Sequence, residues 1–410
     1  MLRIRLSLMM FFQYMIYKSW WFPLAAYLTN MGVQSTQKAL ILSSMAIGCM
    51  ASPIIGMIAD RHFAAQRVLF VLNVVVGFLL ILAARTDEPT MLFFVLLFTM
   101  LFYMPSWSLS SAIAMTHSPS EKFPRIRVFG SIGAVFAGLF SVISVKVFHI
   151  PFDGTNVTFY VGACVAFVAA LSNLTLPHTP SKGKGAPSSF IDALGLRAAK
   201  YMKERNFAIF VILSFISMIP FAMYFAYFSE YLLDIKTEFM TVTMNWGVVA
   251  EMGFMLLIPV AIKKFGLRKV MIIGLVASIV RFVAFYLGGV FDQHWVVYIG
   301  ILVHGLIFGF FYVGGQIYID KKIVGNLKSQ AQGFYFLVTF GLGMLVANII
   351  NGQIIKFFTD SSTGKRIYDW DSIWGLTTIF SIIVLVAFIT LFKNGITKEV
   401  SSTPQLDVLD

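Results

Sequence analysis

The segment PHTPSKGKGAPSSFIDALGLRAAKYMKER, from Pro177 to Arg205, decides how this 410-residue chain is organised. It joins a linker rich in Pro, Gly, Ser and Lys to a short amphipathic stretch, and it is the one clear boundary in the sequence. A window of about 19 residues finds six apolar segments before it and six after it. These segments lie near residues 6–28, 38–59, 67–84, 91–115, 126–148, 157–176, 206–232, 239–262, 268–289, 294–318, 329–357 and 373–392.

The composition places these segments in a lipid bilayer. The chain is 58% hydrophobic and 12% charged, and its mean hydropathy is +0.82, whereas soluble proteins are roughly half apolar and a quarter charged. The net charge of +12 does not indicate a nucleic-acid partner, because the cations flank the apolar segments instead of forming a basic domain. Cys49 and Cys164 both lie inside apolar segments, which argues against a disulfide or a metal site.

The distribution of Lys and Arg predicts the topology. Most of the 31 lie in the N-terminus, the even-numbered loops and the C-terminal tail, so we expect both termini to be cytoplasmic. The first apolar segment has no small-residue cleavage site, which favours a retained helix over a signal peptide. We expect a multi-pass, monomeric protein of the plasma membrane, which in bacteria is the inner membrane.

These signals together predict an all-α membrane protein with twelve transmembrane helices. The expected parts are an N-terminal six-helix bundle, a cytoplasmic linker, a C-terminal six-helix bundle and a cytoplasmic tail. Their boundaries are 1–176, 177–205, 206–393 and 394–410.

A polar loop after the second segment reads Gly56-Met-Ile-Ala-Asp60-Arg61. It is similar to a degenerate G-x-x-x-D-R loop of the major facilitator superfamily. The Asp60 carboxylate can cap a helix N-terminus or pair with an arginine, so Asp60 and Arg61 are candidates for a conformational latch. The alternative is a positive loop that only sets topology.

The fifth segment opens with FPRIRVFGSIG, from Phe123 to Gly133. Here the chain resembles the nucleoside–proton symporter family of the major facilitator superfamily, whose fifth span opens with F-P-x-I-R-x-x-G-[ST]-I-G. The resemblance continues over nearly the whole chain, for example at Tyr103-Met-Pro105, Glu251 and Tyr318-Ile-Asp320. It implies the superfamily fold and import of nucleosides by proton symport with alternating access.

The resemblance also implies several site residues. Arg127 matches an arginine associated with nucleoside binding, and Ser131 matches a Thr that faces the same cavity. Glu251 matches an acid implicated in substrate contact and in proton coupling, and Phe308 matches an aromatic residue that packs on the base.

Other positions depart from the family pattern. Polar residues of the family are replaced at Ala222, Phe225, Val248 and Gly309, a family Tyr is His304, and Lys18 stands where the family commonly has Gly. The resemblance therefore supports the fold and the transport role more strongly than it supports the identity of the substrate. A permease for a sugar, an amino-sugar or a cell-wall fragment is the alternative.

Charged groups inside the apolar segments need partners, because each costs about 2.5 to 3.5 kcal/mol at the bilayer centre on insertion scales. We expect Glu251 to be the only acid deep inside a span, with Lys18 as its favoured partner and Arg127 as another. The alternative for Lys18 is snorkelling to hydrated space. Arg281 is expected to be a helix-packing or structural-pair residue outside the cavity. His304 is a candidate proton relay with Glu251, or else a satisfied hydrogen-bonding side chain.

Aromatic and amide side chains complete the predicted site. Trp20 and Tyr224 are the favoured aromatic candidates for the cavity, and Gln13, Asn245 and Gln316 could add polar contacts. No nucleotide-binding motif, catalytic spacing or metal cluster appears, so we expect no cofactor, no metal and no enzyme. A non-transporting sensor is the remaining rival. The expected partners are a small-molecule substrate, the proton and the bilayer.

Overall fold

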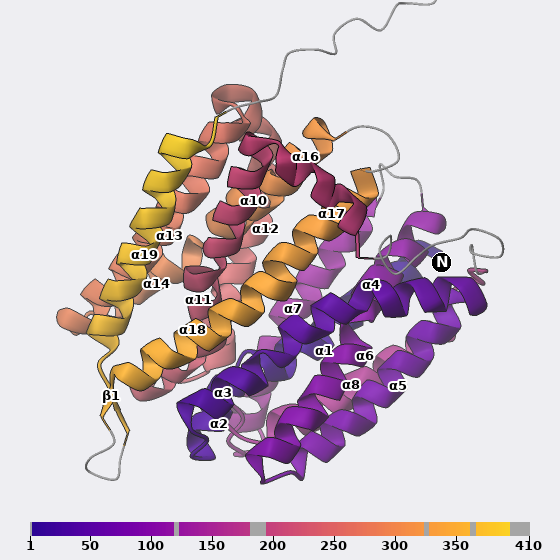
Figure 1. Cartoon of the computed structure of the whole chain (residues 1–410). Coiled ribbons are helices and arrows are strands. Elements are labelled where there is room, and N and C mark those ends of the chain that lie inside the picture. Colours follow the sequence, from indigo (N-terminus) through magenta and orange to yellow (C-terminus); the bar gives the residue numbers. More distant parts are fainter. Residues whose placement is uncertain (1, 119–122, 181–193, 324–327, 361–365, 394–410) are drawn as a thin grey trace, which may run out of the picture.

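The computed structural model describes residues 2–118, 123–180, 194–323, 328–360 and 366–393, and the structural statements below concern these ranges. Side chains of residues 55–62, 124, 328 and 329 are outside the description. Two groups of long helices lie side by side, one from the indigo and purple first half of the chain and one from the second half, coloured from crimson through orange to yellow (Figure 1).

The first half supplies six spans from eight helices. The first span bends at Phe22 and Pro23, where proline cannot donate a backbone N–H and the helix restarts. The second span is interrupted at Ser43. The helices are α1 (Leu2–Trp21), α2 (Leu24–Asn30), α3 (Ser35–Leu42), α4 (Ser44–His62), α5 (Ala65–Ala84), α6 (Pro89–Thr116), α7 (Phe123–Lys146) and α8 (Val157–Asn173).

The second half follows the 3₁₀-helix η2 (Leu196–Lys203). A short antiparallel hairpin of β1 (Thr359–Asp360) and β2 (Ile367–Tyr368) precedes the last span. The helices are α10 (Arg205–Ile216), α11 (Met218–Asp234), α12 (Met240–Phe265), α13 (Leu267–Val290), α14 (His294–Leu302), α15 (His304–Leu306), η3 (Ile307–Val313), α16 (Gly314–Lys322), α17 (Lys328–Phe336), η5 (Leu337–Gly343), α18 (Met344–Phe357) and α19 (Trp370–Leu391).

Each predicted apolar segment corresponds to one of these spans. Nine helical stretches in the described residues are long and apolar enough to cross a membrane, and α8 is a shorter apolar helix. The first two spans complete the twelve, and each of them is broken into two shorter helices.

Spans 10 and 11 each contain a π-helical turn, η3 and η5. Such turns are rare and are often found at functional sites, because they shift the side chains that follow them around the helix. Phe308 lies in η3 and Phe340 lies in η5, and both face the cavity described below.

The two halves contact each other mainly along four helix pairs: α7 with α12, α3 with α18, α2 with α11, and α4 with η5. The largest buried apolar cluster contains residues of both halves. This arrangement leaves space between the halves near the middle of the spans, where the candidate site lies.

Candidate functional site

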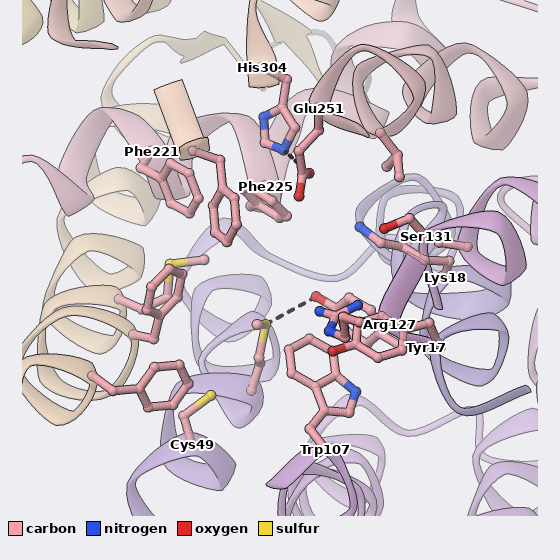
Figure 2. A pocket seen from close by; sticks show the side chains of 18 of the residues that line it. Tyr17, Lys18, Cys49, Trp107, Arg127, Ser131, Phe221, Phe225, Glu251 and His304 are labelled. Atoms are coloured by element: carbon pink, nitrogen blue, oxygen red, sulfur yellow. Dashed lines mark hydrogen bonds and ion pairs between the residues drawn. The ribbon is translucent and has the colours of Figure 1, made fainter. Parts of the chain in front are cut away.

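A cavity lies between the two halves and encloses about 930 Å³ of space free of protein atoms, open solvent included. Spans from both halves contribute its walls, and Figure 2 shows their side chains converging on it. Its charged and polar lining residues are Lys18, Arg127, Ser131, Glu251, His304 and Gln316. Its aromatic lining residues are Tyr14, Tyr17, Trp107, Phe221, Phe225, Phe308, Phe336 and Phe340.

Arg127 belongs to a stack of side chains on the first-half wall. Its guanidinium carbon lies 4.1 Å from the centre of the Tyr14 ring, and that ring stacks on Trp107 at 5.1 Å. Gly130 makes room for the stack, because a Cβ there would lie 2.8 Å from the Tyr14 ring. Ser131 follows one turn after Arg127 and also lines the cavity. The stack orients a planar hydrogen-bond donor beside the cavity.

Lys18 lies among aromatic rings. Its ammonium nitrogen is 3.7 Å from the centre of the Phe22 ring, and it is 5.4 Å and 5.6 Å from the rings of Tyr17 and Phe225. Among the described residues it forms no ion pair, so the expected direct pairing with Glu251 is not what the structure shows. Cation–π contacts instead stabilise this charge beside the cavity.

Glu251 faces His304 on the second-half wall. Its Oε2 lies 3.6 Å from His304 Nε2, and Figure 2 shows the two groups meeting at the cavity edge. The helices approach closely here, because a Cβ on Gly305 would lie 2.5 Å from the Glu251 Cα atom. Glycine is thus what allows α15 to bring His304 beside α12.

Arg281 extends this polar chain behind the wall. Its Nη2 lies 2.9 Å from His304 Nδ1, and its Nε donates to the Gly300 carbonyl at 3.0 Å. The guanidinium carbon also lies 4.0 Å from the centre of the Tyr224 ring. Arg281 therefore lies outside the cavity lining and pairs with His304, which is one of the two structural roles that the sequence left open.

Four predicted site residues lie away from the cavity wall. Trp20 is buried in the first half against Phe159, and Tyr224 lies behind the wall against Arg281. Gln13 donates to Ser106 and accepts from Asn73 within the first half. Asn245 donates to the Val135 carbonyl at 3.3 Å, which joins α12 to α7.

The other predicted residues divide into two groups. Lys18, Arg127, Ser131, Glu251, Phe308 and Gln316 are brought together at the cavity, and so is His304. The side chains of Asp60 and Arg61, the predicted latch, lie outside the described part of the structure.

A buried ion pair links the halves at one membrane face, and sequence reasoning missed it. Lys38 in α3 pairs with Glu230 in α11, and both side chains are fully inaccessible. Glu230 is a second buried acid within a predicted span, but it lies near the end of span 7, whereas Glu251 lies deep inside span 8. A usable signal existed, since Lys38 begins span 2 and Glu230 ends span 7.

Two further contacts tie the halves at the same membrane face. The odd-loop face, as we call it, carries the connections 31–34 and 147–156 and the segments 358–360 and 366–369. Arg366 donates to the carbonyls of Val33 and Gly32 at 2.5 and 2.6 Å. Asp153 accepts from Thr241 across the halves. In Figure 1, α2, α3 and β1 gather at this end, away from the N-terminus.

A second hollow continues from the cavity toward the opposite face. It shares Tyr14, Cys49, Trp107, Arg127, Gln316 and Phe336 with the cavity and reaches Met115 and Gln332. The space between the halves is therefore tied at the odd-loop face and continues toward the other. No group of three or more His, Cys, Asp or Glu in the described residues is placed to hold a metal ion.

Comparisons with known proteins agree with this geometry. A family model described as nucleoside H⁺ symporter matches residues 1–396. A putative nucleoside transporter of Escherichia coli, YegT, is 31% identical over 400 residues, which cover 95% of this chain and 94% of that protein. The xanthosine permease of E. coli is 28% identical over 408 residues, covering 95% of each.

Solved structures give the same fold. A crystal structure of a point mutant of the nucleoside transporter NupG has a TM-score of 0.88 and 25% identity, and covers 96% of this chain and 100% of that one. A D-xylose–proton symporter has a TM-score of 0.70 at 13% identity, covering 95% and 98%, which is a likeness of fold alone. These matches confirm the expected twelve-span transporter fold.

Proposed function

The chain belongs to the nucleoside H⁺ symporter family, and we propose that it imports nucleosides together with protons across a plasma membrane. The observation that carries this proposal is the cavity between the halves, in which Arg127 stacked on Tyr14 faces Glu251 across a set of aromatic rings. A nucleoside joins a flat base to a ribose with hydroxyl groups. Aromatic faces suit the base, and paired donors and a carboxylate suit the hydroxyls and the carbonyls.

Each cavity residue has a part in this proposal. Phe308 and the neighbouring aromatic rings pack on the base, and the Arg127 guanidinium donates to oxygen atoms of the nucleoside. Glu251 accepts from a ribose hydroxyl, while Ser131 and Gln316 add polar contacts. Lys18 gives the cavity a second cation near Arg127, which favours substrates that present oxygen acceptors.

Proton coupling is assigned to Glu251 with His304. A proton on Glu251 removes the charge that faces His304 and that attracts Lys18 and Arg127. The electrostatic attraction between the two halves then becomes weaker, which changes the relative free energy of the inward-open and outward-open states. Because only a group that binds differently in the two states can shift their populations, this cavity carboxylate is the natural site for coupling.

The topology assigned here puts the odd-loop face outside the cell and both termini in the cytoplasm. Lys and Arg concentrate in the other loops and in the terminal segments, which supports this orientation. The conformation is then the inward-facing state, in which substrate leaves toward the cytoplasm. The assigned unit is a monomer in the bacterial inner membrane, with Asp60 and Arg61 as the cytoplasmic latch of the outward-facing state.

Uptake of labelled uridine and adenosine into cells tests the proposal, with panels of nucleosides and sugars as competitors. We expect nucleosides to compete, and an uncoupler to abolish accumulation. Competition by sugars alone would show that the substrate is a sugar or a related compound and not a nucleoside. Accumulation that is unchanged by the uncoupler would exclude proton symport.

The site is tested by one substitution. Arg127→Lys should lower uptake at least tenfold, because lysine loses the planar donor pair. Arg125→Lys, two residues earlier and exposed, is the matched control and should transport normally.

A further inference from the structure

Arg281 is a buried cation that the transport cycle proposed above leaves without a role. It lies in α13 with 1% of its surface exposed, and it contacts Gly300, His304 and Tyr224. Among the described residues it has no ion pair with a carboxylate. A charged group inside a membrane span is costly, so a buried guanidinium that donates to a cavity histidine is expected to have a specific function.

The hydrogen-bond chemistry of Arg281 fixes the state of His304. A guanidinium has five donors and no acceptor, so the His304 Nδ1 atom, 2.9 Å from Nη2, must accept. The ring proton of a neutral His304 then lies on Nε2, which faces Glu251 Oε2 at 3.6 Å. A doubly protonated ring would set an N–H group against an N–H group of Arg281.

We propose that Arg281 is a positioning residue, which holds His304 as the neutral Nε2–H tautomer and so keeps a fixed hydrogen-bond donor directed at Glu251. His304 then serves the coupling pair as a donor and does not carry the transported proton, which is bound by Glu251 alone. The part concerning Glu251 rests on the proposed function, whereas the tautomer of His304 does not.

The charges around the pair support this assignment. A second proton on His304 would add a positive charge close to Arg281 and Lys18, which repel it in a low-dielectric site. The Glu251 carboxylate is the one acid that faces the ring among the described residues. The groups that face the pair from the surrounding helices are Tyr14, Lys18, Arg127, Tyr224 and Arg281.

A spectroscopic measurement on the unaltered protein tests the tautomer directly. Protein labelled with ¹⁵N-histidine is purified, and the His304 signal is identified by its loss in His304→Gln. We expect a neutral ring with its proton on Nε2 from about pH 5.5 to 8, although an ordinary histidine titrates near 6.5. A proton on Nδ1, or an imidazolium at neutral pH, would overturn the proposal. This result does not depend on which substrate is transported.

Three substitutions test the consequence for transport. Arg281→Gln fills the site but can turn its carbonyl toward an Nδ1–H group, so it permits the imidazolium. We expect its uptake to fall at least tenfold, relative to the unaltered protein, as the pH drops through about 6.5. Arg281→Lys has only donors and should retain the original pH profile. In a His304→Gln background, Arg281→Gln should cause no additional acid-dependent loss, because the two effects act through one side chain.

Arg268→Gln is the matched control, since Arg268 lies in the same helix and donates to the carbonyls of Phe392 and Ile389. It should leave the pH profile unchanged. An original pH profile in a folded Arg281→Gln protein, or an equal acid-dependent loss in the His304→Gln background, would reduce Arg281 to a structural residue. If the unaltered protein takes up no nucleoside at any pH, the proposed function fails while the ¹⁵N measurement still decides the role of Arg281.

Discussion

The ammonium group of Lys38 and the Oε1 atom of Glu230 form an ion pair that joins the two halves at the odd-loop face. Thr29 donates to the same carboxylate oxygen and accepts from the same ammonium, so the pair is part of a small buried network. A buried charge that loses its partner costs about 3 to 5 kcal/mol, whereas removal of both charges costs far less. Loss of one member alone is therefore expected to destabilise the closed form of this face far more than loss of both.

Substitution of Lys38 should open the odd-loop face. In a Cys164→Ala background, Cys49 of the cavity is the single thiol and reports access from the odd-loop face, which the proposed topology places outside the cell. We expect Lys38→Met to increase the labelling of Cys49 by a membrane-impermeant reagent, because unpaired Glu230 destabilises the closed state. Lys38→Met with Glu230→Met should restore most of the closure.

The control for this experiment is Lys322→Met, because Lys322 pairs with the partly exposed Glu204 at the other end of the molecule. It should leave the labelling of Cys49 from outside unchanged. Unchanged labelling in Lys38→Met itself would show that the ion pair does not hold the face closed.

Asp153, at the same face, should make the stability of the folded protein depend on pH. It lies in the connection between α7 and α8, accepts from Ser141 at 2.8 Å and from Thr241, and burial raises the pKa of its carboxyl group. Because the folded-state pKa is raised, its contribution to stability is full below about pH 3.9 and is lost as the pH rises through the raised pKa.

Thermal unfolding in detergent measures this effect. The Tm of the unaltered protein should decline from about pH 4 upward, and Asp153→Asn should remove that part of the decline. Asp292→Asn, at a carboxylate whose side chain is 94% exposed, should leave the decline unchanged. A pH profile of Tm that is identical in Asp153→Asn and the unaltered protein would contradict the assignment.

Lys18 should matter through its charge and not through an ion pair. Lys18→Met is expected to fold and to lower nucleoside uptake at least tenfold, because the cavity loses a cation that lies over the Phe22 ring. Lys18→Arg keeps the charge and should recover part of the uptake. Full uptake by Lys18→Met would show that Lys18 only extends its ammonium group into hydrated space and has no role in transport.

The close approach at Gly305 can be tested by stability. Gly305→Ala places a Cβ 2.5 Å from the Glu251 Cα atom, so we expect a loss of about 1 to 3 kcal/mol in the free energy of unfolding. Gly253→Ala, in α12 with no atom within 4 Å of the added Cβ, should be neutral or stabilising. The Tm values of both variants provide the measurement, and equal values would contradict the close approach.

Sequence alone determined much of this protein. Runs of apolar residues that are long enough to cross a bilayer give the twelve spans, and the polar segment from Pro177 to Arg205 divides them. The resemblance carried by residues 123–133 led to Arg127 and Ser131, and its continuation in span 8 led to Glu251; the fold brings all three to one cavity. These signals are local, so they can be read without knowledge of how the helices pack.

The tertiary structure decided which helix faces meet. In a membrane both the lipid and the protein interior are apolar, so hydrophobicity does not mark the buried face of a span. Trp20 and Trp107 therefore look alike in sequence, although one lies in the core of the first half and the other at the cavity. The partner of Glu251 and the pairing of Lys38 with Glu230, 192 residues apart, depend on helix rotation and packing, which only the folded chain fixes.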